Sequence, residues 1–182
     1  VQKEKKLASL RGFDSVFDGL LFPQKVERPL FDRQIDIIME QLAPHMRRYA
    51  KLIQRVHGLE EMTFADLRIA VDPSYEPQVS IEESKKYIRG ALSVLGEDIL
   101  KVVDTQYNNR GIDFVMNIGK STGAFCATPY RKQSFILTAW SDRMSDVFTL
   151  AHELGHAGHF HWAHRDQNIF DIEPSSYFVE AP

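Results

Sequence analysis

The sequence predicts a mainly helical fold with one small β insert. Three observations support this class: a long run of apolar residues at helical spacing near the start, a group of short β-prone segments between residues 111 and 140, and a second helical pattern after residue 145. With 182 residues, 43% of them apolar, the chain is long enough to bury a core. We expect a helical region at 1–110, a small β region at 111–140 and further helices at 145–182.

The first helical pattern is the most regular one. Its apolar positions follow one another at steps of three or four residues: Phe31, Ile35, Ile38, Leu42, Met46, Tyr49, Ile53 and Val56. This spacing predicts one face of a helix of about seven turns. Pro44 lies inside it and should kink it, because proline lacks a backbone donor and clashes with the preceding turn. Gly58 is suited to end the helix.

A capping signal opens the next helical stretch. Ser80 and Glu83 stand three residues apart, as in a capping box, so we expect a helix to begin there. Apolar residues at helical spacing continue to Val103, and Gly96 should interrupt the stretch.

Between the two helical patterns, three β-prone runs at 113–117, 124–127 and 134–140 are separated by turn-forming glycine and proline residues. They predict a small sheet. After a polar turn, Ser145 is the expected N-cap of the last long helix. The buried stripe of that helix should consist of Val147, Leu150, Ala151, Leu154 and Ala157.

Composition and charge exclude several classes of function. The net charge of −3 offers no basic surface, which argues against nucleic acid as a partner. No apolar run reaches the roughly 18 residues of a membrane span, so we expect no membrane segment. The single cysteine, Cys126, cannot form an internal disulfide and should be a small buried β residue; this favours a cytoplasmic location. Since the chain lacks an initiator Met and stops at Pro182 within an unfinished element, we expect both ends to be truncated.

The last helix carries the run His152-Glu153-Leu154-Gly155-His156. Two histidines four residues apart lie on one helix face, where both rings can bind one tetrahedral zinc ion. Glu153 should lie beside the metal and act as the general base for a zinc-bound water. This H-E-x-x-H pattern is typical of metalloproteases. Just upstream, we expect the segment 135–139 to be an edge strand that pairs with a peptide substrate.

A catalytic zinc site needs a third protein ligand. The metzincin pattern fails, because His159 and Trp162 occupy the positions of its glycine and third histidine. A gluzincin takes a glutamate from the next helix instead. The downstream candidates are Asp166, Asp171, Glu173 and Glu180. Asp166 lies too near the end of the helix for the chain to reverse. Glu173 precedes a proline and should lie in a loop, whereas Glu180 follows a helix start with enough chain to return, so geometry favours Glu180. His159 itself either lines the site or is a helix-face histidine bonded to its neighbours.

Two longer segments carry a family resemblance. Residues 148–159 and 176–182, supported by 11–15 and 136–138, resemble the M3 family of zinc oligopeptidases, closest to bacterial oligoendopeptidase F and the Pz-peptidase-like enzymes. The resemblance implies a zincin-like, largely helical catalytic region with a deep channel, acting on oligopeptides in the cytoplasm. It also implies that His152, His156 and Glu180 bind one zinc ion and that Glu153 is the base.

The resemblance also implies missing parts. In the family the chain continues past Pro182 and begins before Val1, so residues 1–182 would be the central part of the catalytic domain. The later helices supply a carboxylate that supports the zinc site and Tyr and His groups that stabilise the oxyanion. The isolated segment should therefore bind zinc weakly and show little activity. Two alternatives remain: a non-catalytic metal-binding or inactive fragment, and a zinc enzyme of another class such as an aminopeptidase.

Overall fold

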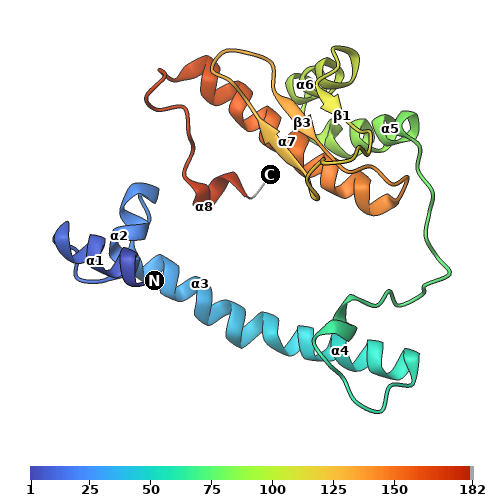
Figure 1. Cartoon of the computed structure of the whole chain (residues 1–182), viewed down its shortest axis with the longest axis horizontal. Helices are drawn as coiled ribbons and strands as arrows, with labels where there is room; N and C mark the ends of the chain where they lie inside the picture. Colours follow the sequence, from blue (N-terminus) through green and yellow to red (C-terminus); the bar gives the residue numbers. More distant parts are fainter. Residues whose placement is uncertain (181–182) are drawn as a thin grey trace. The chain divides into compact units, whose positions relative to one another are not determined.

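The computed structural model describes residues 1–180 of the chain. The chain divides into two compact units, Val1–Tyr75 and the part that begins at Glu76, although no linker is evident from composition. Figure 1 shows helices in both units and the strands in the second alone. The expectation of a mainly helical fold with a small β insert is therefore confirmed.

The first unit is entirely helical in its regular structure. It contains α1 (Gln2–Leu10), α2 (Val16–Leu21), α3 (Arg28–Ile37) and α4 (Ala43–His57), with short 3₁₀ turns at Phe22–Gln24 and Ala65–Arg68. A π-helical turn at Ile38–Leu42 joins α3 to α4, so the predicted long helix is present from residue 28 to residue 57 (Figure 1). Gly58 ends it in the left-handed conformation, with φ 62°.

The π-helical turn accounts for the irregularity expected at Pro44. Pro44 lies in the first turn of α4, directly after the π turn. In a regular helix its ring would clash with the carbonyl group of Glu40 one turn earlier. The π turn, which is wider than an α-helical turn, contains Glu40 and interrupts the regular i→i−4 backbone hydrogen bonds at that point. Of the predicted apolar stripe, only Ile53 is fully buried.

The second unit holds the sheet and the longest helix. Its elements are α5 (Ile81–Leu92), a 3₁₀ turn (Ser93–Leu95), α6 (Glu97–Asn108), β1 (Ile112–Asp113), β2 (Phe125–Ala127), β3 (Phe135–Leu137), α7 (Met144–Asp166) and α8 (Ser176–Val179). The predicted capping box of Ser80 and Glu83 opens α5, and Gly96, with φ 94°, separates the 3₁₀ turn from α6. None of the described helices has the length and apolar character that crossing a membrane requires.

The strand order is β1-β3-β2, so β3 is the central strand. Ile136 pairs with Ile112 of β1 in parallel and with Cys126 of β2 in antiparallel fashion. The expectation that residues 135–139 form an edge strand is therefore wrong, because both sides of β3 are occupied. The edge strand that packs against α7 is β2.

Helix α7 forms the centre of the core. Leu150, Leu154 and Ala157 are 0% exposed and pack with Val103 of α6 and Ile136 of β3. The predicted buried stripe is confirmed, with Ala151 only partly buried. Burial on one face fixes the rotation of α7 and so determines which side chains its other face presents.

The start of α7 differs from the prediction. The helix begins at Met144, so Ser145 lies inside its first turn and not at the N-cap. The cap is made by Asp146, whose Oδ2 accepts hydrogen bonds from the backbone N–H of Ser141 at 2.7 Å and of Arg143 at 3.1 Å. A carboxylate in the first turn satisfies free N–H groups and favours the helix dipole.

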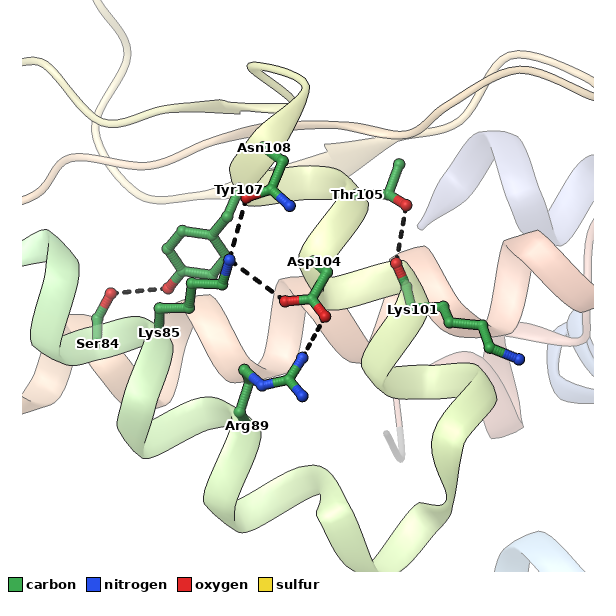
Figure 2. A network of polar contacts seen from close by, with 8 residues as sticks. All are labelled: Ser84, Lys85, Arg89, Lys101, Asp104, Thr105, Tyr107 and Asn108. Carbon is green, nitrogen blue, oxygen red and sulfur yellow. Dashed lines mark hydrogen bonds and ion pairs between the residues drawn. The ribbon is translucent and has the colours of Figure 1, made fainter.

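A polar network joins α5 to α6 (Figure 2). Asp104 forms ion pairs with Arg89 and, at 3.3 Å, with Lys85. The hydroxyl groups of Ser84 and Tyr107 lie 2.7 Å apart, and burial raises the pKa of Tyr107, so this hydroxyl stays protonated. Half-exposed ion pairs of this kind contribute roughly 0–1 kcal/mol each.

Gly158 sets the distance between α6 and α7. A Cβ atom at this position would lie 2.4 Å from Cδ1 of Ile99, whose side chain is only 2% exposed and cannot turn outward. We expect Gly158→Ala to destabilise the protein by about 1 kcal/mol, because overpacking costs roughly 1–3 kcal/mol and exceeds the gain of about 1 kcal/mol in helix propensity.

Gly90 of α5 provides the matched control, since a Cβ atom there meets nothing within 4 Å. Gly90→Ala should raise stability by up to about 1 kcal/mol. Denaturant unfolding of both variants measures the difference; equal shifts in the same direction would contradict the close contact at Gly158.

Candidate metal centre

Three of the predicted site residues converge in the second unit. Nε2 of His152 and Nε2 of His156 lie 3.0 Å apart on α7. Oε2 of Glu180 lies 3.6 Å from the first nitrogen and 3.8 Å from the second. These ligand atoms all fall within 4.8 Å of one another, a separation at which one metal ion can contact all three.

Local structure explains why Glu180 reaches the histidines. After α7 ends at Asp166, the chain runs through a loop to Ser175, whose Oγ accepts a hydrogen bond from the backbone N–H of Tyr177 at 3.3 Å and caps α8. Glu180 follows the last residue of this short helix. Glu173 lies in the preceding loop and is exposed. Within the described residues, Glu180 therefore lies near the two histidines, and Glu173 is not part of this group.

The three side chains fit a zinc ion. Two imidazole nitrogens and one carboxylate oxygen form a ligand set of catalytic zinc sites. Bond lengths of about 2.0–2.2 Å in a tetrahedron put neighbouring ligand atoms about 3.3–3.6 Å apart. The distances among the three candidate ligand atoms, 3.0, 3.6 and 3.8 Å, are close to that range. Burial, followed by the proximity of His152, lowers the pKa of His156 and favours the neutral ring that metal binding requires.

Two buried polar atoms at the site have no hydrogen-bond partner within residues 1–180: Nδ1 of His156 and Oε2 of Glu153. A buried polar atom without a partner is costly. A metal-ligating histidine normally donates its other nitrogen to an oxygen acceptor, so Nδ1 of His156 offers a place for such an acceptor.

The carboxyl group of Glu153 is buried beside the two histidines. Its side chain is only 6% exposed, and burial raises the pKa of its carboxyl group; His152 lowers this pKa and Glu180 raises it further. A raised pKa makes a carboxylate a better proton acceptor near neutral pH. The neighbouring position on α7 places Glu153 in the same cavity as the two histidines.

The cavity around the site has a volume of about 420 Å³. Besides the four residues named above, it is lined by Ala124, Phe125, Cys126, Phe160 and Val179. Of these five lining residues, only Phe160 could be expected from the sequence, because it follows His156 by one helical turn. Cys126 lies in β2 as expected but is half-buried and lines this cavity, because the pairing of β2 with β3 brings it to α7.

His159 does not line this cavity. It lines a separate one of about 350 Å³ together with Trp162, Asp166 and Pro174. Of the two roles considered for His159, a direct one at the metal centre is therefore not supported.

The helical fold with its small sheet matches the folds of solved structures. A solved structure described as Pz peptidase A with inhibitor 2 matches with a TM-score of 0.79 and 17% sequence identity, over 99% of this chain and 33% of that one. The model of Peptidase family M3 matches residues 1–182, and the chain belongs to this family.

Curated relatives agree with this assignment. Oligopeptidase PepF of Bacillus subtilis (strain 168) is 28% identical over 188 residues, which cover 100% of this chain and 28% of the relative. An oligoendopeptidase F homolog of Borreliella burgdorferi is also 28% identical, and the match covers 98% of this chain and 32% of that relative. The chain thus spans about a third or less of the length of these relatives, and the expected resemblance to oligoendopeptidase F is confirmed.

Proposed function

We propose that this chain is the central segment of a zinc-dependent endopeptidase that hydrolyses peptide bonds in oligopeptides. One observation carries the proposal: His152, His156 and Glu180 offer three ligand atoms within 4.8 Å of one another, beside the buried carboxyl group of Glu153. Membership in Peptidase family M3 supports the reaction class, and relatives named as oligopeptidases support oligopeptide substrates.

Each residue then has a defined role. His152, His156 and Glu180 would hold one zinc ion, which when bound supplies Lewis-acid polarisation of the scissile carbonyl group and activation of water. Glu153 accepts a proton from the attacking water molecule and donates it to the nitrogen of the leaving amine. Burial of Glu153 suits this role because it raises the pKa of the carboxyl group, which makes the carboxylate a better proton acceptor.

The edge strand β2 is the proposed support for the substrate backbone. In the described part of the chain its outer edge carries no strand, and Phe125 and Cys126 border the cavity of the metal centre. An extended peptide can add to such an edge through main-chain hydrogen bonds. This would place a peptide bond next to Glu153 and the histidines.

Metal removal tests the proposal in the full-length protein. We expect a chelator to abolish cleavage of a fluorogenic oligopeptide and one equivalent of Zn²⁺ to restore it, because the metal activates the water. Metal analysis and the peptide assay are run on the same samples. Zinc bound at one equivalent without cleavage of any peptide would instead favour the non-catalytic alternative, and cleavage only from a free N-terminus would favour an aminopeptidase.

Three further expectations remain part of this proposal. Residues 1–182 would form the central part of the catalytic domain, with both ends continued in the full-length protein. The isolated segment should bind zinc weakly and show little activity, because Nδ1 of His156 has no partner within the described chain. The lone cysteine favours a cytoplasmic location.

A further inference from the structure

The loop between β1 and β2 leads directly into the edge strand. Because β3 lies between these two strands, the chain that leaves β1 at Asp113 crosses the end of β3 before β2 begins at Phe125. The register shows this crossing, since Leu137 at the end of β3 is paired with Asp113 on one side and with Phe125 on the other. The place where β2 begins therefore depends on how the loop is held.

Lys120 is the one residue between positions 115 and 123 that is not exposed. Its side chain is only 4% exposed, and its Nζ donates hydrogen bonds to the backbone oxygens of Val115 at 2.7 Å and of Asp113 at 3.0 Å. Nζ also forms an ion pair with Oδ1 of Asp113 at 3.3 Å. An ammonium group has three donors, so these three oxygen atoms compensate for its removal from water. The lysine is thus the main attachment of an otherwise exposed loop.

The backbone oxygen of Asp113 links Lys120 to the sheet. The same oxygen accepts a hydrogen bond from the backbone N–H of Thr138 at 3.1 Å, directly after β3. Thr138 is only 2% exposed and so belongs to a well-packed part of the unit. Nζ of Lys120 is therefore fixed to the end of the sheet, and residues 121–124 alone connect this fixed point to β2.

We propose that Lys120 is a positioning residue for the substrate, because it holds the loop that leads into β2 and so keeps the edge of β2 ready to pair with a peptide. The inference rests on the proposed function, in which this edge supports the substrate backbone. Lys120 is not among the residues that line the cavity of the metal centre. It acts through β2 and not on the reacting groups.

Strand β2 needs such support because its own pairing is short. It has three residues, all of which pair with β3, and within residues 1–180 only this one side of β2 carries a partner strand. Phe125, the first residue of β2, is 49% exposed. A strand end with few buried contacts opens locally at low cost. When only a fraction of molecules has the edge in place, the apparent affinity for a peptide falls by that fraction.

Replacement of Lys120 should therefore change KM and not kcat. Pairing with the edge of β2 is made in the ground state and in the transition state alike, so its loss is a loss of uniform binding. In the full-length enzyme with zinc, we expect Lys120→Met to raise KM for a fluorogenic oligopeptide by roughly three- to ten-fold, with kcat and zinc content unchanged. Lys120→Arg keeps a cation that can donate to the same oxygens and should restore most of the parent KM.

Lys132 provides a matched control on the other side of β2. It follows Ala127, the last residue of the strand, by five positions, as Lys120 precedes Phe125 by five positions. Its side chain is exposed. Lys132→Met removes the same charge and should leave KM unchanged. Thermal unfolding of each variant is measured in parallel, because a purely structural role would lower the unfolding temperature and the amount of active enzyme without changing KM.

The outcomes separate this inference from the proposed function. If the zinc-loaded parent enzyme cleaves no peptide, the proposed function fails and the role of Lys120 fails with it. If peptides are cleaved but Lys120→Met keeps the parent KM, lowers kcat alone, or changes KM no more than Lys132→Met, the positioning role is overturned while the endopeptidase function stands. If Lys120→Met does not fold, Lys120→Gln takes its place and is judged by the same criteria.

Discussion

Replacement of Glu153 by glutamine should lower kcat for oligopeptide cleavage by roughly 10²–10⁴-fold and leave zinc binding intact. Glutamine keeps the size and shape of the side chain but cannot accept a proton from water. The carboxyl group of Glu153 is not among the three ligand atoms that converge, so its loss should not change the metal content. Steady-state kinetics with a fluorogenic peptide, together with metal analysis of the same preparation, measure both effects in the full-length protein.

Stability measurements separate this effect from misfolding. Glu153 is 6% exposed and its Oε2 has no hydrogen-bond partner within residues 1–180. A neutral amide avoids the cost of burying a charge at this position, so the variant should unfold at the same temperature as the parent or at a higher one. A variant that keeps more than a tenth of the parent kcat would remove Glu153 from the role of general base.

The elements with strong local signals were predictable from the sequence. The capping box at Ser80, the left-handed end at Gly58 and the buried stripe of α7 all depend on neighbours within a few residues, and the structure contains each of them. The same is true of the pair His152 and His156, since helical periodicity alone brings their rings to one face. Such features need no knowledge of the tertiary fold.

The features that were missed depend on contacts between distant segments. The central position of β3 follows from its pairing with β1, a strand of only two residues with almost no sequence signal. The apolar walls of the cavity depend on that same sheet order, which brings Cys126 of β2 to α7. The N-cap of α7 is an exception, because it is local: the carboxylate of Asp146 accepts hydrogen bonds from the backbone N–H groups of Ser141 and Arg143, so the helix begins before Ser145.

Glu180 was only partly predictable from the sequence, and its replacement is the second change from which we expect a large effect. Spacing favours it over Glu173 and the family resemblance assigns it, but only the fold of the loop after α7 brings it to the histidines. We expect Glu180→Ala to lower zinc affinity by more than the roughly 10–100-fold that loss of a group supporting a ligand costs, because Glu180 would be a direct ligand in the proposed site. Activity at limiting zinc should fall with it, and isothermal titration with Zn²⁺ measures the affinity.

Glu173→Ala is the matched control for this experiment, since it removes an exposed glutamate of the same loop-to-helix segment, seven positions before Glu180. It should bind zinc like the parent protein. If the two variants lose affinity equally, the segment matters only as a whole and Glu180 is not a ligand. If Glu173→Ala alone loses zinc, the chain after α7 takes a different course in the metal-bound protein. If only Glu180→Ala loses zinc affinity, the prediction holds. That variant keeps His152 and His156 but lacks the carboxylate that a gluzincin site requires.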